Sequence, residues 1–311
     1  MSGAVIERIR VSAFIILALL LGSVVWILGA SWGWHFEGWL TTELGFHDAA
    51  AAGCVHTIAG FFALGVLINL GPRLGRFLPD GKSVPIPGHS VPMTVIGLML
   101  IIVGFFGFLG GCAIYIGGGQ WINIFGQPMT LSAFAFNTLM GFAGGVIGAF
   151  LVTRDPFWMM SGALAGIISA ASGLDLYYPP VAFLIAFVGG CMIQPVSLLL
   201  EKFKIDDAVG AFAVHGVAGL WGMISCGIFA AGYPQIDPSW PAISFGGQLA
   251  SAAVMAALGF FPGYLCSLVL KMFGVLRVGG KAEELGLDET EIPIRPYPEG
   301  TPASALRVPA E

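Results

Sequence analysis

Two histidines in this chain share one sequence context, although each lies inside a long apolar run. Asp48–Gly60 reads DAAAAGCVHTIAG and Asp207–Gly219 reads DAVGAFAVHGVAG, so both fit the pattern D-A-x-x-A-x-x-V-H-x-x-A-G. Imidazole can donate and accept a proton, and its charge changes easily near neutral pH. Ionisable groups inside membrane segments are energetically costly and usually functional. We therefore interpret His56 and His215 as the centre of a membrane pore or transporter.

A single histidine in an apolar helix is often only a hydrogen-bonding partner for a neighbouring helix. Two histidines in matched contexts favour a functional role instead. Burial favours the neutral form of imidazole, so a buried pair would share one proton rather than bind two. Such a pair can hydrogen-bond a small polar solute or relay a proton without holding a fixed charge.

The spacing also predicts where the two rings lie. Each histidine follows the aspartate of its motif by eight residues, which is about 12 Å along a helix. In the topology derived below, Asp48 marks the outer end of its span and Asp207 the inner end. The two helices then approach the middle of a ~30 Å core from opposite faces, with the rings within roughly 6 Å of each other along the membrane normal. This arrangement is typical of an inverted repeat with a site at the repeat interface.

The two motif aspartates allow two interpretations. An aspartate at a helix N-terminus caps free N–H groups and complements the helix dipole, which would make Asp48 and Asp207 structural. Either carboxylate could instead contact a passing solute directly. Small residues around both histidines, such as Gly60 and Gly219, allow close helix approach.

The elements that must position these residues are long apolar helices. Hydrophobic residues make up 57% of the 311 residues and charged residues only 10%, whereas a soluble domain carries roughly 25% charged residues. We therefore predict an all-α, polytopic membrane protein with about eight transmembrane helices, because apolar runs long enough to span ~30 Å recur along the chain. The predicted spans are 11–33, 49–71, 91–117, 129–152, 157–176, 179–200, 208–231 and 243–275.

The distribution of charge predicts the orientation of these spans. With eight spans and the N-terminus inside, all 13 Lys and Arg residues fall in cytoplasmic segments, at the inner end of the last span or in the tail, as the positive-inside rule requires. We expect a multi-pass protein of the cell (inner) membrane with both termini in the cytoplasm. Residues 1–275 form the predicted transmembrane domain, and the polar residues 276–311 form a cytoplasmic tail.

Several other classes of function find little support. The chain has no basic patch for nucleic acid, and its five cysteines lack metal-type spacing. It contains neither H-E-x-x-H nor G-x-S-x-G, so we predict no enzymatic activity and no cofactor. Two histidines alone provide few ligands for zinc, which argues against a metal site or a metal channel.

Eight segments along the chain form a family-like series. They are SGAVIERIRVS at 2–12, the first histidine motif with LGPR at 70–73, HSVPM at 89–93, GFFGF at 104–108, FNT at 136–138, SGALAG at 161–166, DDAVGAFAVHGVAG at 206–219, and LRV with EELGLD at 276–288. Taken together, these segments resemble the ammonium transporter family (Amt/Mep/Rh). They correspond in order to the family's loop between its third and fourth helices, its fifth, sixth, seventh, eighth and tenth helices, and its cytoplasmic tail.

The resemblance implies a homotrimer with one hydrophobic conduction path in each subunit. Ammonium would be recruited at an outer vestibule by cation–π contacts and lose a proton, and ammonia would then pass the twin histidines. The family's tail contacts small trimeric nitrogen-regulatory proteins, which makes such a protein a possible partner. The residues matched to family roles are the pore histidines His56 and His215, the gate residue Phe108, and the vestibule residues Trp34 and Asp48. Cys112 takes a vestibule position where the family frequently has serine, and Asp207 is predicted to be structural, as a helix cap.

The sequence also departs from the family pattern. The resemblance begins after the family's first three helices, which carry the other gate phenylalanine. Leu109 replaces a family asparagine, and Gly210 replaces an acid common five residues before the second histidine. These departures favour an alternative hypothesis, in which the chain is a non-conducting ammonium sensor or regulatory homologue that acts through its tail.

Overall fold

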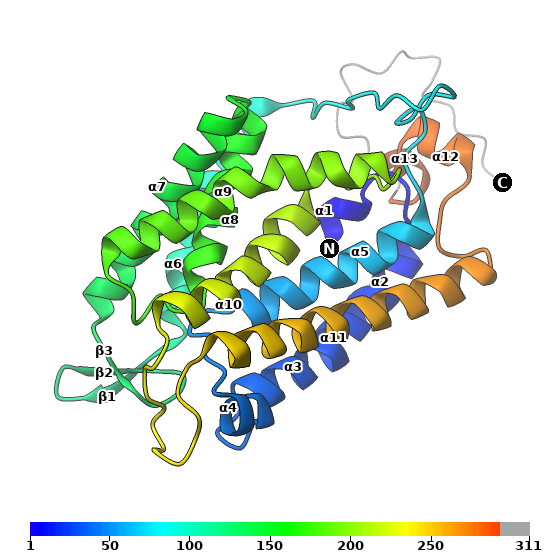
Figure 1. The fold of residues 1–311 in the computed structure, drawn as a ribbon. Coiled ribbons are helices and arrows are strands. Elements are labelled where there is room, and N and C mark those ends of the chain that lie inside the picture. Colours follow the sequence, from blue (N-terminus) through cyan, green and yellow to red (C-terminus); the bar gives the residue numbers. More distant parts are fainter. Residues whose placement is uncertain (293–311) are drawn as a thin grey trace.

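Long helices run side by side through the body of the molecule in the computed structural model, which describes residues 1–292 (Figure 1). In the first part of the chain, the segments are α1 (Ser2–Val5), α2 (Val11–Leu20), η1 (Leu21–Val25), α3 (Trp26–Gly33), α4 (Trp39–Leu44), η2 (Ala52–Thr57), α5 (Ile58–Leu70) and α6 (Val91–Gly110). The segments labelled η are π-helical and continue directly into the adjoining α-helices. Consequently α2, η1 and α3 form one span, and η2 with α5 forms the next.

The second part of the chain contains the remaining spans and the beginning of the tail. The segments are α7 (Leu131–Val152), α8 (Pro156–Ala171), α9 (Pro179–Lys202), η3 (Phe212–Val217), α10 (Ala218–Phe229), α11 (Phe245–Met272), α12 (Gly280–Leu285) and α13 (Leu287–Thr290). In the part of the chain that the structure describes, 7 helical segments are long and apolar enough to cross a membrane. The eighth predicted span, 157–176, contains the shorter helix α8.

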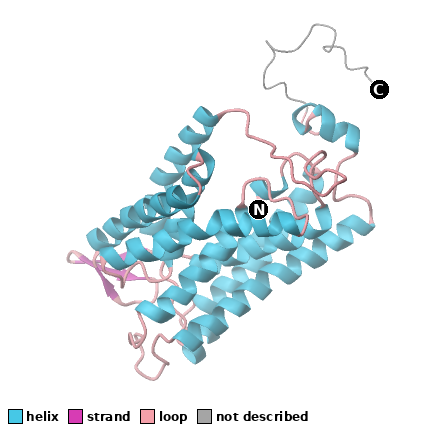
Figure 2. Ribbon diagram, turned by 45° about the horizontal axis from the view of Figure 1, so that its top comes forward, coloured by secondary structure: helices cyan, strands magenta, loops and turns pink. Residues whose placement is uncertain are grey.

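A small sheet lies at one end of the bundle and was outside the all-helical prediction (Figure 2). Strands β1 (Ala113–Gly117), β2 (Gln120–Asn123) and β3 (Pro128–Met129) pair antiparallel in the order β1-β2-β3. The predicted span 91–117 therefore ends as a helix at Gly110, and its last residues form a strand. The cause is local: β-branched and aromatic residues favour a strand in 113–117, and Gly117–Gly119 all have positive φ and turn the chain back.

Caps and small residues explain where helices begin and how closely they pack. Asp155 accepts hydrogen bonds from the backbone N–H groups of Phe157 and Trp158 at the start of α8, as an N-cap residue does.

Between α7 and α8, a methyl group added at Gly145 would overlap the carbonyl oxygen of Gly162. Backbone contact of this kind is how small residues bring membrane helices together.

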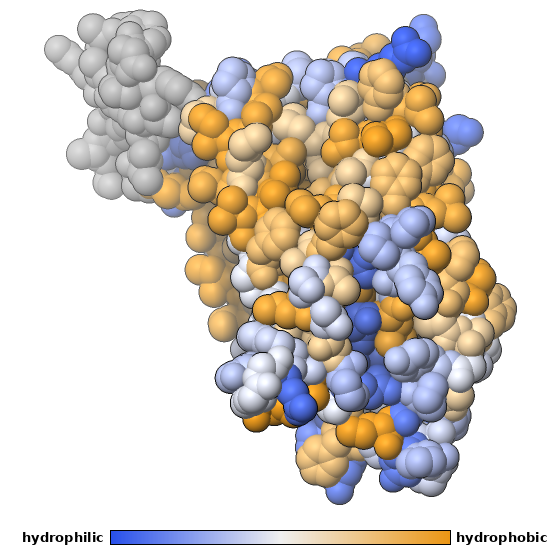
Figure 3. All heavy atoms as spheres, turned by 90° about the vertical axis from the view of Figure 1, so that its left-hand side faces the viewer, coloured by the Kyte–Doolittle hydropathy of each residue, from blue (hydrophilic) through white to orange (hydrophobic). Residues whose placement is uncertain are grey.

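The outer surface of the bundle is strongly apolar. Only Leu109 is buried in α6, and many other apolar side chains on the spans are exposed. Broad hydrophobic areas cover the side that carries the sheet in Figure 1, with hydrophilic side chains between them in the lower half (Figure 3). A soluble protein rarely exposes apolar area on this scale, whereas a helical bundle surrounded by lipid tails does.

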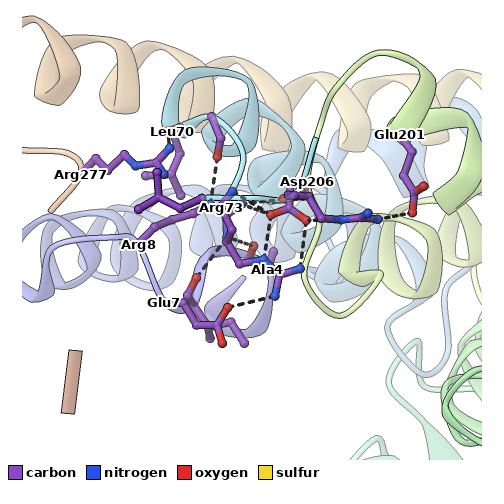
Figure 4. A network of polar contacts seen from close by, with 12 residues as sticks. Ala4, Glu7, Arg8, Leu70, Arg73, Glu201, Asp206 and Arg277 are labelled. Atoms are coloured by element: carbon purple, nitrogen blue, oxygen red, sulfur yellow. Dashed lines mark hydrogen bonds and ion pairs between the residues drawn. The ribbon is translucent and has the colours of Figure 1, made fainter. Parts of the chain in front are cut away.

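The opposite end of the bundle, where α12 and α13 lie, is held by a buried charged cluster (Figures 1 and 4). The side chain of Arg8 is 0% exposed, and its guanidinium donates to the carbonyl oxygens of Gly71 at 2.9 Å and Asp206 at 2.6 Å. Arg73 donates to both carboxylate oxygens of Asp206, at 2.8 and 3.1 Å. Arg277 donates to the carbonyl oxygen of Leu70 at the end of α5, at 3.1 Å, and so links the tail to this end.

Burial and charge act on the ionisation of this cluster in opposite directions. Burial lowers the pKa of Arg8 to about 10, and the negative charge of Asp206 opposes that effect. For Asp206, burial would raise the pKa, but hydrogen bonds from Arg73 and the charges of Arg8 and Arg73 hold it below its ordinary value. The carboxylate therefore remains ionised and keeps three distant segments of the chain together.

Candidate functional site: the buried histidine pair

The two motif histidines meet inside the bundle. The Nδ1 atoms of His56 in η2 and His215 in η3 lie 3.0 Å apart, and the rings are stacked with centroids at 5.1 Å and an interplanar angle of 16°. His56 is 8% exposed and His215 is half-buried. In an Nδ1–Nδ1 hydrogen bond one nitrogen donates and the other accepts. The pair therefore shares a single proton along this contact.

The two histidine segments have the same local structure. Each histidine lies in a π-helical turn that continues into an α-helix, and such turns occur frequently at functional sites. Each turn is preceded by a residue with positive φ, Ala51 at 79° and Gly210 at 69°. Each motif aspartate then accepts hydrogen bonds from the turn that follows it, so the sequence repeat is also a structural repeat.

Asp48 is a complete N-terminal cap. Its carboxylate accepts from the backbone N–H groups of Ala52, Gly53 and Cys54 at 2.8, 2.8 and 2.9 Å, and from the hydroxyl of Ser172 at 3.1 Å. Asp48 is 0% exposed, and burial raises its pKa although these hydrogen bonds oppose the rise. Of the two interpretations that the sequence allows for Asp48, this geometry supports capping.

Asp207 caps the second segment less completely. One of its carboxylate oxygens accepts from the backbone N–H of Phe212 at 2.7 Å, while Oδ1 is buried without a hydrogen-bond partner. Burial raises the pKa of Asp207, and hydrogen bonds from the backbone oppose the rise. The hydrogen bond from Phe212 supports the capping interpretation of Asp207.

The two histidine helices cross at glycines. A methyl group added at Gly60 would overlap the backbone nitrogen and Cα of Gly216. Gly216 directly follows His215 in the sequence, and Gly60 lies one helical turn after His56. The contact between the two imidazole rings therefore depends on the absence of side chains at this crossing.

Aromatic rings surround His56. Phe108, the predicted gate residue, contacts His56 edge-on with ring centroids 6.2 Å apart. Phe105 lies parallel to the same imidazole at 6.2 Å and also contacts Phe142 at 5.8 Å. The resemblance does not single out Phe105, but its spacing of three residues from Phe108 would place both on one face of a helix.

The remaining predicted vestibule residues lie around Asp48 and the end of α6. Trp34 donates from its indole nitrogen to the backbone oxygen of Asp48 at 2.8 Å. Cys112 follows α6, and its thiol donates to the carbonyl oxygen of Phe108 at 3.8 Å. Burial, with the charges of Asp48 and Asp175, raises the pKa of Cys112 to about 11, so the thiol stays protonated near neutral pH.

Comparison with known proteins decides the family. The model of the Ammonium Transporter Family matches residues 1–296, which is most of the chain. Ammonium transporter Amt2 of Methanocaldococcus jannaschii is 34% identical over 302 residues, covering 96% of this chain and 67% of the relative. The chain belongs to the ammonium transporter family. Ammonium transporter Amt1 of the same organism is 33% identical, with 96% of this chain and 73% of that protein covered.

Solved structures of this family have the same fold. A structure described as Sensor Amt Protein superposes with a TM-score of 0.80 at 28% identity, covering 93% of this chain and 72% of that one. A point mutant of Candida albicans Mep2 superposes with a TM-score of 0.74 at 25% identity, covering 90% of this chain and 63% of that one. These superpositions confirm the prediction of a polytopic helical membrane protein. The prediction of a non-enzymatic protein agrees with membership of the ammonium transporter family.

Among residues 1–292 of this ammonium transporter family member, no group of three or more His, Cys, Asp or Glu side chains is arranged to hold a metal ion.

A further histidine, outside the pair, is buried beside the capping residue of the His56 segment. His47, directly before Asp48, is 0% exposed and pairs with Asp175. The duplicated pattern does not indicate His47, although an ionisable residue beside a motif aspartate is itself a signal.

Proposed function

We propose that this chain provides a conduction path for ammonium or ammonia that runs past His56 and His215. The single observation that carries the proposal is the Nδ1–Nδ1 contact of 3.0 Å between two histidines from the duplicated segments. Because that contact occupies one nitrogen of each ring, each Nε2 is left for another partner. The Nε2 of His56 is buried and has no hydrogen-bond partner.

The buried Nε2 of His56 could form a hydrogen bond with a small polar solute. Buried polar atoms normally have a hydrogen-bond partner, and an imidazole nitrogen can either donate or accept. Ammonia can do the same, so it suits this position whichever nitrogen holds the shared proton. The pair can also hand on a proton, because exchanging donor and acceptor between the two Nδ1 atoms moves it from one ring to the other.

The aromatic rings beside His56 favour a neutral solute over an ion. Phe105 and Phe108 provide apolar walls next to the imidazole, and taking an isolated charge from water into such surroundings is strongly unfavourable. Ammonium would therefore transfer its proton to water in the outer vestibule, and ammonia would go on to the pair. The proposed recruitment site is the outer vestibule near Trp34, Asp48 and Cys112, where an aromatic face can attract a cation.

The proposal includes an orientation and an assembly. The arginines Arg8, Arg73 and Arg277 cluster at one end of the bundle, and the positive-inside rule assigns such an end to the cytoplasm. Both termini would then be cytoplasmic in the cell membrane. As the family resemblance implies, the chain would act as a homotrimer whose tail contacts a small nitrogen-regulatory protein.

A second candidate function is sensing of ammonium without conduction. It is favoured by the superposition on the structure described as Sensor Amt Protein, at a TM-score of 0.80. In that case ammonium would bind near the same histidine pair and change the position of the tail. Transport and sensing differ in whether ammonium crosses the membrane.

The deciding experiment is a current measurement on proteoliposomes after an ammonium concentration jump. The parent chain, His56→Ala and the exposed control His35→Gln are compared at equal protein density. Conduction past the pair predicts a current in the parent and the control that His56→Ala abolishes. Equal currents in the parent and His56→Ala would exclude the proposed path, and ammonium binding without any current would favour the sensor.

A further inference from the structure

A buried histidine–carboxylate pair lies immediately next to the capping residue of the His56 segment. The Nε2 atom of His47 is 3.1 and 3.2 Å from the two carboxylate oxygens of Asp175. The two side chains are 0% and 1% exposed. Neither residue belongs to the histidine pair or to the aromatic rings beside it, so the proposed conduction path leaves their burial unexplained.

The pair satisfies a carboxylate that would otherwise be costly to bury. In residues 1–292, no Lys or Arg forms an ion pair with Asp175, and its described polar partners are His47 and Asn123. Asn123 donates to Asp175 at 2.6 Å. A buried carboxylate without partners loses several kcal/mol of solvation, so His47 supplies a donor that no apolar side chain could replace.

The backbone of His47 is clamped as firmly as its side chain. Its carbonyl oxygen accepts from the amide of Gln248 in α11 at 2.6 Å and from the hydroxyl of Ser172 at 3.2 Å. The backbone N–H of Ala49 donates to the carbonyl oxygen of Ser172 at 2.9 Å. The turn at residues 47–49 is thus fixed against the end of α8 on one side and against α11 on the other.

This turn positions Asp48, which caps the helix that carries His56. Asp48 follows His47 directly and holds the first three N–H groups of that segment. On the other side, the ring of His47 stacks on Phe125 in the loop between β2 and β3, with centroids 4.6 Å apart. His47 therefore joins the loop of the outer sheet, the end of α8 and the beginning of the His56 helix.

We propose that His47 and Asp175 are positioning residues for ammonium conduction, which fix the turn that begins the His56 helix and thereby hold His56 against His215. The inference rests on the proposed function, because conduction is what the positioning would serve. It adds an outer support to the path, nine residues before His56 along the chain.

The test compares four variants by ammonium-induced current in proteoliposomes. His47→Leu removes the donor to Asp175, whereas His47→Gln retains an N–H group that can reach the carboxylate. His47→Leu/Asp175→Leu removes both partners, so that no unpaired carboxylate stays buried. His35→Gln is the matched control, because His35 is an exposed histidine in the loop between α3 and α4.

Positioning predicts a loss of maximal current rather than of apparent affinity. His47→Leu should lower the saturating current about tenfold or more, since small misplacements at a reactive centre have effects of this size. The half-saturating ammonium concentration should stay within about twofold, because uniform binding is unchanged. His47→Gln should recover most of the current, and His35→Gln should match the parent.

The double variant separates positioning from mere stability. If His47→Leu fails only because it leaves a carboxylate unpaired, His47→Leu/Asp175→Leu will regain the current, and the positioning role is overturned. If the turn itself must be held, the double variant assembles but still conducts poorly. Equal saturating currents in His47→Leu and His47→Gln would also overturn the proposal.

A second readout keeps the proposal testable even if the parent carries no current. The thiol of Cys54 is buried, and its backbone N–H is held by Asp48. A loosened turn should expose it, so site-resolved thiol alkylation in detergent should label Cys54 faster in His47→Leu than in the parent or His47→Gln. Labelling at parent rates in all variants would reject positioning, whereas absence of current in the parent would reject the conduction proposal alone.

Discussion

Gly60 packs directly against the backbone of Gly216, at the point where the two histidine helices cross. No side chain separates the helices there, and His215 is the neighbour of Gly216 in the sequence. The separation of the two imidazole rings is therefore set by a backbone contact rather than by the histidine side chains themselves. In lipid, where hydrophobic burial does not drive helices together, such contacts carry much of the association.

The first prediction is that Gly60→Ala separates the histidine helices. The added methyl group would overlap backbone atoms of Gly216, which cannot move aside as a side chain can. We expect a lower thermal unfolding midpoint in detergent and a reduced ammonium current. Gly22→Ala is the matched control, because nothing lies within 4 Å of a methyl group added there. Equal effects of the two substitutions would contradict the role of the crossing.

A second prediction concerns the chemistry of the pair. His215→Leu keeps a side chain of similar bulk but removes the nitrogen that bonds His56 at 3.0 Å. The variant should assemble like the parent, judged by size-exclusion chromatography, and carry a much smaller ammonium current. Replacement of either histidine by Asp should change selectivity more than assembly, because it introduces a charge where the parent shares a proton. Parent-like conduction by His215→Leu would remove the pair from the mechanism.

A third prediction separates a buried cap from an exposed one. Asp48→Ala leaves three buried N–H groups without their acceptor, and loss of a cap costs about 0.5–2 kcal/mol. Asp155→Ala removes the exposed cap of α8, where water can replace the carboxylate. Thermal unfolding should therefore show the larger loss for Asp48→Ala. The reverse order would indicate that Asp48 does not stabilise its helix.

The fourth prediction is a pH dependence at the charged end of the bundle. The pKa of Asp206 is held below its ordinary value by Arg73 and Arg8, against the effect of burial. Its contribution to stability is thus fully present above about pH 4, the ordinary aspartate pKa, and is lost as the pH falls through the lower folded value. The difference in unfolding midpoint between the parent and Asp206→Asn should shrink below about pH 4. A difference that stays constant down to about pH 3, beyond the ordinary aspartate range, would contradict this assignment.

The sequence predicts most of the helical architecture because length and hydropathy determine it. An apolar run of about 20 residues has few alternatives to a spanning helix. The repeated Asp–His spacing identifies the two segments whose histidines meet inside the bundle. Three features escape such reasoning for identifiable reasons. The sheet depends on the turn at Gly117–Gly119, which interrupts an apolar run, and Phe105 becomes notable only once its ring is seen parallel to His56.

The contact between His47 and Asp175 is the third such feature, because it joins residues 128 positions apart. No local sequence pattern predicts a contact between residues so far apart in the chain. Similarly, the sequence leaves open whether Asp48 caps its helix or faces a solute, since both roles suit an aspartate at a helix start. The structure distinguishes them, because three backbone N–H groups at the start of the helix donate to the carboxylate of Asp48.

Arg8 has a consequence for the order in which the protein is built. Its guanidinium bonds the carbonyl oxygen of Asp206, which is made 198 residues later. During synthesis, Arg8 leaves the ribosome long before Asp206 exists, so this hydrogen bond cannot yet form. The turn that carries Arg8 can be completed only after α9 and the loop that follows it have been made. Closure of the Arg8 site is therefore a late step in biogenesis, and it requires the second half of the chain to be in place.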